Sequence, residues 1–120
     1  MLSENQRTID KYMAAFRVSD HAAILACLTD DVEWDIPGMH HSRGKAAFDK
    51  EIGNEAFTGN PDIVVTRTIE ENDVVVAEGT VRTQKRDGAE VRLRFCDVFV
   101  MEAGKIKQLV SYLTDFKESR

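Results

Sequence analysis

The sequence predicts an α+β domain in which three N-terminal helices lie against one face of an antiparallel sheet. Apolar residues in the first half recur at helical spacing, whereas from about residue 63 onward they alternate with polar residues or are β-branched. A length of 120 residues supports one hydrophobic core and no second domain. We therefore expect a single domain over residues 1–120.

The first two helices are predicted from capping residues. Ser3 and Gln6 have the spacing of a capping box, which predicts a helix over residues 4–18. The Ser-Asp pair at 19–20 can cap a second helix of about eight residues, which ends before the acidic residues at 30–31.

A strand and a loop follow the second helix. Val32, Trp34 and Ile36 alternate with acidic residues, which predicts a half-buried strand that ends at the Pro-Gly pair 37–38. The segment 39–43 contains two adjacent histidines and is expected to be a surface loop.

The remainder of the chain is predicted to form one more helix and a meander of strands. The third helix is expected from Gly44 to about Phe57, where the segment 58–61 breaks it. Short turns then separate four strands, which makes an antiparallel meander the expected arrangement. The predicted strands cover residues 63–71, 74–85, 89–101 and 106–115.

Composition excludes several classes of partner. A formal net charge of -5 argues against nucleic acid, whose binding proteins usually display basic surfaces. No apolar run reaches the length of about 18 residues that a membrane span requires, and no signal peptide is recognised, so no membrane partner is expected. Cys27 and Cys96 have apolar neighbours, which predicts buried, reduced thiols and a cytoplasmic protein.

The strand over residues 89–101 carries a carboxyl group on its apolar face. Every odd-numbered residue from 91 to 101 is apolar except Asp97. Side chains two residues apart in a strand share a face, so Asp97 is expected on the buried side of the sheet. An ionised carboxylate there costs several kcal/mol unless it is protonated, hydrogen-bonded or paired. Asp97 is therefore the first candidate for a catalytic acid or base.

Glu78 is the predicted partner of Asp97. A two-residue loop at 87–88 would place Glu78 opposite Asp97, and two carboxyl groups so close would share a proton near neutral pH. A general acid or base uses this arrangement. Two alternatives stay open. Arg82 or Arg94 could neutralise one acid in a structural ion pair, and an odd loop length would turn Glu78 to the other face.

A set of largely apolar side chains is expected to line a ligand pocket. Tyr12 lies at helical spacing among apolar residues, so its hydroxyl needs a hydrogen-bond partner, which is a backbone carbonyl in the structural alternative. His40 and His41 point in opposite directions on an extended loop and do not suit one metal ion, so no metal is expected. The other predicted binding residues are Phe16, Trp34, Ile36, His40, Phe48, Ile52, Arg82, Phe95, Phe99 and Leu109.

The opposite face of the sheet is predicted to bind a second copy of the chain. Three helices cannot cover both faces of the sheet, and small apolar side chains gather on the uncovered face. The predicted homodimer surface consists of Cys96, Val98, Val100, Ala77 and Val75.

The order of elements and several short motifs resemble the SnoaL-like branch of the nuclear transport factor 2-like superfamily, which also includes ketosteroid isomerases. This resemblance implies a cone, in which a strongly curved sheet wraps round the first helix and encloses an apolar pocket. It also implies a cystatin-like α+β barrel, usually in a homodimer. The motifs are Tyr12, the segment 28–38, Arg43-Gly44, the segment 94–99 and the segment 103–106.

The resemblance also implies roles for individual residues. Tyr12 falls where ketosteroid isomerases keep the tyrosine of their oxyanion hole, and Asp97 falls where they keep its protonated aspartate. The general base of these isomerases would align with Ile36, and Asp35 is expected on the opposite face. In polyketide cyclases of this branch, an aspartate near the position of Asp97 serves as acid or base.

A further relative, limonene epoxide hydrolase, uses two aspartates bridged by an arginine. Asp97, Glu78 and Arg82 would correspond loosely to that set.

Two classes of function follow from these residues. The first is an enzyme that transfers protons on a small apolar organic ligand by isomerisation, cyclisation or hydration, without a cofactor. Asp97 would be its acid or base, Tyr12 would donate a hydrogen bond to an oxyanion, and Glu78 would tune Asp97. The second is a non-catalytic module of the same fold that binds a ligand or dimerises.

Overall fold

The computed structural model describes residues 2–53 and 57–115. Within these residues, no helix has the length and apolar character needed to cross a lipid bilayer. The elements are, in chain order, α1 (Glu4–Arg17), α2 (His21–Leu25), β1 (Leu28–Ile36), β2 (His40–Arg43), α3 (Lys45–Ile52), β3 (Phe57–Glu71), β4 (Val74–Lys85), β5 (Glu90–Glu102) and β6 (Lys105–Asp115).

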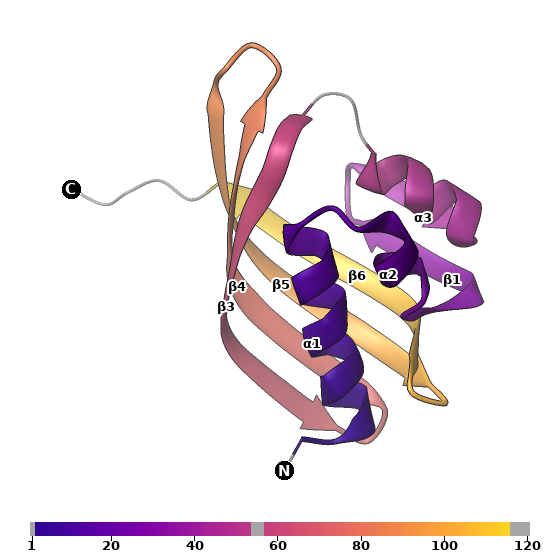
Figure 1. Cartoon of the computed structure of the whole chain (residues 1–120). Coiled ribbons are helices and arrows are strands. Elements are labelled where there is room, and N and C mark those ends of the chain that lie inside the picture. Colours follow the sequence, from indigo (N-terminus) through magenta and orange to yellow (C-terminus); the bar gives the residue numbers. More distant parts are fainter. Residues whose placement is uncertain (1, 54–56, 116–120) are drawn as a thin grey trace.

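The strands form one curved sheet with the order β2-β1-β6-β5-β4-β3. The predicted antiparallel meander is confirmed for β3, β4, β5 and β6. β1 pairs parallel to β6, which makes the sheet mixed rather than wholly antiparallel. Figure 1 shows α1 lying across the concave face of the sheet, with α3 over β1 and α2 between α1 and α3. The predicted α+β class, with the helices on one face, is thus confirmed.

Both predicted helix caps are present. The Ser3 hydroxyl accepts a hydrogen bond from the backbone N–H of Gln6 at 3.0 Å, which satisfies a free donor in the first turn of α1. The Asp20 carboxylate does the same for the N–H of Ala23 at 3.1 Å at the start of α2.

The second helix is shorter than predicted. α2 has five residues instead of about eight, because the chain already joins the sheet at Leu28. The carbonyl of Cys27 accepts a hydrogen bond from the N–H of Ile106 at 2.8 Å, and this contact starts the parallel pairing with β6. Asp30 therefore lies in a strand, where local sequence predicted a helix end.

Two segments predicted as irregular are strands. The predicted loop at 39–43 contains β2, which pairs with β1 through Trp34 and Ser42. The predicted break at 58–61 lies inside β3, which is an edge strand. An edge strand tolerates a proline because one of its sides forms no hydrogen bonds with another strand. The pairing of β3 with β4 also shifts register between Thr58 and Asp62. α3 ends at Ile52, and the predicted helix residues 54–56 lie outside the described residues.

The predicted register between β4 and β5 is wrong by one residue. The N–H of Lys85 donates to the carbonyl of Ala89 at 2.9 Å, so the connection is longer than a two-residue loop. Glu78 consequently lies opposite Cys96, and Asp97 lies opposite Ala77. A change of register by one residue moves the side chains of β4 that were expected on one face of the sheet to the other face, as the alternative with an odd loop length predicted.

The register also changes the composition of the outer face. Ala77 and Val75, which were expected there, are fully buried in the core beneath α1. Cys96, Val98 and Val100 remain on the outer face and are partly exposed. The predicted dimer surface therefore loses Ala77 and Val75.

Gly79 allows β3 and β4 to approach closely. A Cβ atom at this position would overlap the carbonyl oxygen of Val64 and would lie 2.9 Å from Cζ of Phe95. We expect Gly79→Ala to lower the free energy of unfolding by about 1–3 kcal/mol, measured by urea denaturation. Gly53→Ala is the control, since its nearest neighbour would be at 3.5 Å. Equal stability of the two variants would contradict this close approach.

Candidate active site

A largely apolar cavity of about 110 Å³ lies between α1 and the concave face of the sheet and is partly open to solvent. Its polar groups come from four residues, on α1, β1, β5 and β6, and the other lining side chains are apolar. A small organic molecule with a mainly apolar surface would fit such a cavity. The lining residues are Tyr12, Met13, Phe16, Trp34, Ile36, Ile63, Val81, Phe95, Asp97, Ser111 and Leu113.

Asp97 lies in the middle of β5 and points inward, as its position in the alternating pattern predicts. Its neighbours on the adjacent strands are Ala77 and Ser111, and only 9% of its surface is exposed. Burial raises the pKa of Asp97 to about 7, while a hydrogen bond with the Ser111 side chain opposes this rise. Asp97 therefore changes its charge close to neutral pH.

Tyr12 brings a phenol to the same cavity from α1. Its ring is buried and packs against Phe16 and Phe99, with both centroid distances at 5.5 Å. Burial raises the pKa of Tyr12 well above its ordinary value, and the negative charge of Asp97 adds to this effect. Tyr12 therefore stays protonated and can donate a hydrogen bond within the cavity.

Trp34 is both a wall of the cavity and a hydrogen-bond donor. Its ring stacks on Phe48 with a centroid distance of 4.4 Å and an interplanar angle of 25°. Its indole N–H donates to the hydroxyl of Ser111 at 3.0 Å. Ser111 is not among the predicted site residues, although its place between Leu109 and Leu113 in the alternation of β6 predicts an inward side chain.

Six of the predicted site residues line the cavity, and four predicted wall residues lie elsewhere. Phe48, Phe99 and Leu109 are fully buried and form the core that supports the cavity. Ile52 packs against that core without lining the cavity. The predicted residues that do line it are Tyr12, Phe16, Trp34, Ile36, Phe95 and Asp97, and those missed are Met13, Ile63, Val81, Ser111 and Leu113.

Glu78 does not share a proton with Asp97, which corrects the prediction. It lies on the outer face of the sheet because of the register of β4 and β5. Its carboxylate accepts hydrogen bonds from Arg67 of β3, at 2.9 Å from Nε and 2.6 Å from Nη2. The partner of Glu78 is thus Arg67, and neither Arg82 nor Arg94, the two arginines predicted as alternatives.

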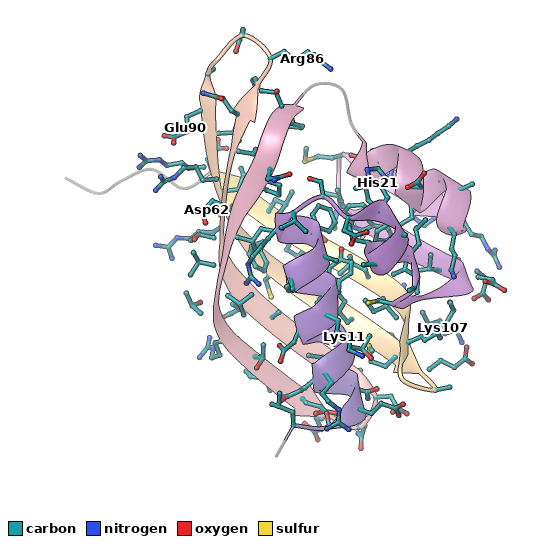
Figure 2. All side chains as sticks on the ribbon, in the orientation of Figure 1. Lys11, His21, Asp62, Arg86, Glu90 and Lys107 are labelled. Carbon is teal, nitrogen blue, oxygen red and sulfur yellow. The ribbon has the colours of Figure 1, made fainter. Side chains whose placement is uncertain are left out.

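Arg82 lies outside the cavity and close to the free end of the β4–β5 hairpin. Its Nε atom is 3.5 Å from the Glu90 carboxylate in an exposed ion pair. Figure 2 shows Glu90 and Arg86 at this end of the hairpin, away from the helices. The predicted role of Arg82 in ligand binding is therefore not supported by its position.

His40 also lies outside the cavity lining. Its ring packs edge-on against Trp34 at 6.1 Å, and its Nδ1 atom is 3.7 Å from the Glu51 carboxylate. His41 lies beside Asp35, at 3.8 Å, so the two histidines point in opposite directions as expected. Among residues 2–53 and 57–115, no group of three or more His, Cys, Asp or Glu side chains is placed to hold a metal ion.

The family follows from a match over most of the chain. The model of the SnoaL-like domain family matches residues 9–109. The chain belongs to this family. Solved nuclear transport factor 2-like proteins have the same α+β cone, which confirms the predicted fold of this SnoaL-like domain. No curated protein matches it in sequence.

Three solved structures illustrate the range of this fold. An LEH-like epoxide hydrolase from M. tuberculosis has a TM-score of 0.82 and 20% identity, over 92% of this chain and 83% of that chain. A protein provisionally named ketosteroid isomerase from Kribbella flavida has a TM-score of 0.77 and 16% identity, over 98% and 82%. A protein provisionally named polyketide cyclase from Pseudomonas putida has a TM-score of 0.76 and 27% identity, over 93% and 92%. The fold of this SnoaL-like domain is therefore shared by hydrolases, isomerases and cyclases.

The raised pKa of Asp97 makes stability depend on pH. The unfolded chain loses this proton near the ordinary pKa of 3.8, whereas the folded chain keeps it until about pH 7. The wild type should therefore lose stability as the pH rises from about 4 to 7. Asp97→Asn removes the titrating group and with it this pH dependence. The free energy of unfolding of Asp97→Asn relative to that of the wild type should therefore increase by up to about 4 kcal/mol between pH 4 and pH 8.

Urea denaturation across this pH range measures the effect. The matched control is Asp30→Asn, whose carboxyl group is fully exposed. Its stability relative to wild type should stay nearly constant. A stability difference between Asp97→Asn and wild type that is the same at both pH values would exclude a raised pKa for Asp97.

Proposed function

We propose that this SnoaL-like domain is an enzyme that transfers a proton within a small, mostly apolar organic molecule. The observation that carries the proposal is the Asp97 carboxyl, which faces an apolar cavity and has its pKa raised to about 7 by burial. A group with a pKa close to the working pH is present in both protonation states, which general acid–base catalysis requires. The reactions that suit it are isomerisation, cyclisation and hydration.

In an isomerisation, Asp97 transfers the proton and Tyr12 stabilises the oxyanion. The Asp97 carboxylate removes a proton from a carbon next to a carbonyl group, and the electron pair of the C–H bond moves toward the carbonyl oxygen. Tyr12, which stays protonated, donates a hydrogen bond to the oxyanion that forms. Asp97 then returns the same proton to a different carbon. Every atom comes from the substrate or from these two side chains, so the reaction uses no cofactor.

The composition of the cavity favours reactions that need a single carboxyl group as acid or base. Among the described residues that line it, Asp97 is the sole carboxylate, and there is no arginine. Glu78 and Arg82 are held in ion pairs elsewhere, so the acid–arginine–acid set that the resemblance to limonene epoxide hydrolase suggested is not formed. Isomerisation or cyclisation is therefore preferred to epoxide hydrolysis.

The volume of the cavity limits the substrate. An apolar cavity of about 150 Å³ is known to hold benzene, so a cavity of about 110 Å³ suits one small ring or a short chain. A larger molecule would have to extend through the opening to solvent. We therefore propose a substrate whose reacting part is a single ring or a short chain with one carbonyl group.

The proposal also includes a homodimer in the cytoplasm. Both cysteines are unpaired thiols, which is typical of a reducing compartment. The outer face of the sheet carries a strip of apolar side chains that none of the helices in residues 2–53 and 57–115 covers (Figure 1). Such a strip is typical of a protein interface. Its members are Val74, Val76, Cys96, Val98, Val100 and Val110, with Tyr112 at its border.

The dimer predicts a specific effect of charge on this strip. Wild-type protein should sediment as a dimer at micromolar concentration, and Val98→Glu should sediment as a monomer because it would bury a carboxylate in the interface. Val18→Glu is the control, since Val18 is exposed at the end of α1. A wild-type monomer at all concentrations would contradict the dimer.

Turnover of a six-membered β,γ-unsaturated ketone tests the proposed reaction. Its conversion to the conjugated isomer is followed by ultraviolet absorbance. Asp97→Asn should lower kcat/KM by about 10²–10⁴-fold, and Tyr12→Phe by about 10²-fold or more, because they remove the base and the oxyanion donor. Asp35→Asn is the control, because Asp35 is partly exposed and pairs with His41 outside the cavity.

Binding is measured separately by the fluorescence of Trp34, the one tryptophan of the chain, which lines the cavity. Quenching that persists in Asp97→Asn while turnover is lost would support a catalytic role. Ketones that quench Trp34 without being converted by the wild type would favour the non-catalytic ligand-binding module instead.

A further inference from the structure

Trp34, Ser111 and Asp97 form a chain of hydrogen bonds at the cavity wall. The Trp34 indole N–H donates to the Ser111 hydroxyl at 3.0 Å. Ser111 lies directly opposite Asp97 in the sheet, and a hydrogen bond from its side chain lowers the pKa of Asp97. An indole nitrogen can only donate, and a serine hydroxyl has one proton and two lone pairs. Trp34 occupies one lone pair of the Ser111 oxygen. An ionised Asp97 carboxylate can only accept, so its hydrogen bond with Ser111 uses the proton of the Ser111 hydroxyl.

We propose that Trp34 and Ser111 are positioning residues, which form a one-way hydrogen-bond relay that holds the Asp97 carboxylate ready to accept a proton from the substrate. The catalytic meaning of this inference rests on the proposed function. The relay itself is a property of the protein without substrate, so it can be tested separately.

The fold holds the members of the relay in place. They come from β1, β6 and β5, which are successive strands of the sheet (Figure 1). Ser111 lies directly opposite Asp97 and is only 5% exposed. The parallel pairing of β1 with β6 places Trp34 opposite Leu109, two residues from Ser111 and on the same face. Stacking on Phe48 then orients the indole ring. Each donor therefore has little freedom to turn away.

Few other groups influence the charge of Asp97. Tyr12 on α1 is the sole other titratable side chain among the described residues that line the cavity, and it stays neutral. On β4, Asp97 faces Ala77, which carries no charge. Cys96, its neighbour on β5, points to the outer face opposite Glu78. Among the described residues, Ser111 is therefore the polar neighbour that lowers the pKa of Asp97.

The relay and burial act in opposite directions. Burial favours the neutral acid, whereas the hydrogen bond from Ser111 favours the carboxylate, and the pKa of about 7 is the balance of the two. Without the relay, Asp97 would be mostly protonated at neutral pH. A protonated Asp97 can donate a proton but cannot remove one.

Carbon-detected NMR titration of the Asp97 carboxyl group tests the relay in the free protein. Ser111→Ala should raise the pKa of Asp97 by about one pH unit or more, because a hydrogen bond to a charged group is lost. Ser111→Thr keeps the hydroxyl and should retain the wild-type value. The matched control is Ser42→Ala, since Ser42 is also buried, at 8% exposure, and its hydroxyl has no hydrogen-bond partner among the described residues.

The contribution of Trp34 is tested by a double-mutant cycle. Trp34→Phe should raise the pKa of Asp97 by less than Ser111→Ala does. In the Ser111→Ala background, Trp34→Phe should cause no further change if Trp34 acts through Ser111. A second measurement needs no Trp34 variant, because the chain has one tryptophan. The indole N–H signal should titrate with the midpoint of Asp97 in the wild type and lose this dependence in Ser111→Ala.

Several outcomes would overturn the relay. An unchanged or lowered Asp97 pKa in Ser111→Ala would do so, as would an indole signal that still follows Asp97 in that variant. A shift caused by Trp34→Phe in the Ser111→Ala background would remove Trp34 from the relay. These results are independent of turnover. Loss of activity in Asp97→Asn with an unmoved pKa in Ser111→Ala would leave the proposed function standing and remove the relay.

Discussion

The alternation of side chains along β5 is the constraint on which the rest of the structure depends. β5 lies between β4 and β6 in the sheet, so each of its side chains belongs either to the concave face under α1 or to the outer face. Phe95, Asp97 and Phe99 point inward, and Cys96 and Val98 point outward. The same alternation therefore provides the wall of the cavity, its acid and the apolar strip of the outer face.

A carboxyl group on the concave face is unfavourable unless the surrounding structure compensates for it. The cavity gives Asp97 no cationic partner among the described lining residues. Its ionised form is favoured by the hydroxyl of Ser111 and disfavoured by burial, so its pKa lies near 7 instead of at either extreme. An acid and a phenol thus face one apolar space, and the phenol stays neutral because it is buried as well. This difference in ionisation is what proton transfer to and from a carbonyl compound requires.

Long-range pairing assembles the polar part of the site. Trp34 and Ser111 are 77 residues apart in the chain and become neighbours because β1 adds to the sheet parallel to β6. The same pairing ends α2 early and draws the acidic segment at 30–31 into a strand. The hydrogen bonds between the strands therefore fix the positions of the polar side chains of the site. Three residues predicted to line the cavity instead lie in the fully buried core beneath it, namely Phe48, Phe99 and Leu109.

The sequence by itself determined the α+β class, the helix caps, the antiparallel meander and the inward position of Asp97, because these follow from the local spacing of apolar and capping residues. It also placed Tyr12 and Trp34 correctly, since each lies on an apolar face of its element. Only the tertiary structure decided the register of β4 and β5, because one additional residue in the connection changes it. This register places Glu78 on the outer face, where it pairs with Arg67. Likewise, only the tertiary structure brought Ser111 to Trp34, because a parallel strand pair leaves no local pattern in the chain.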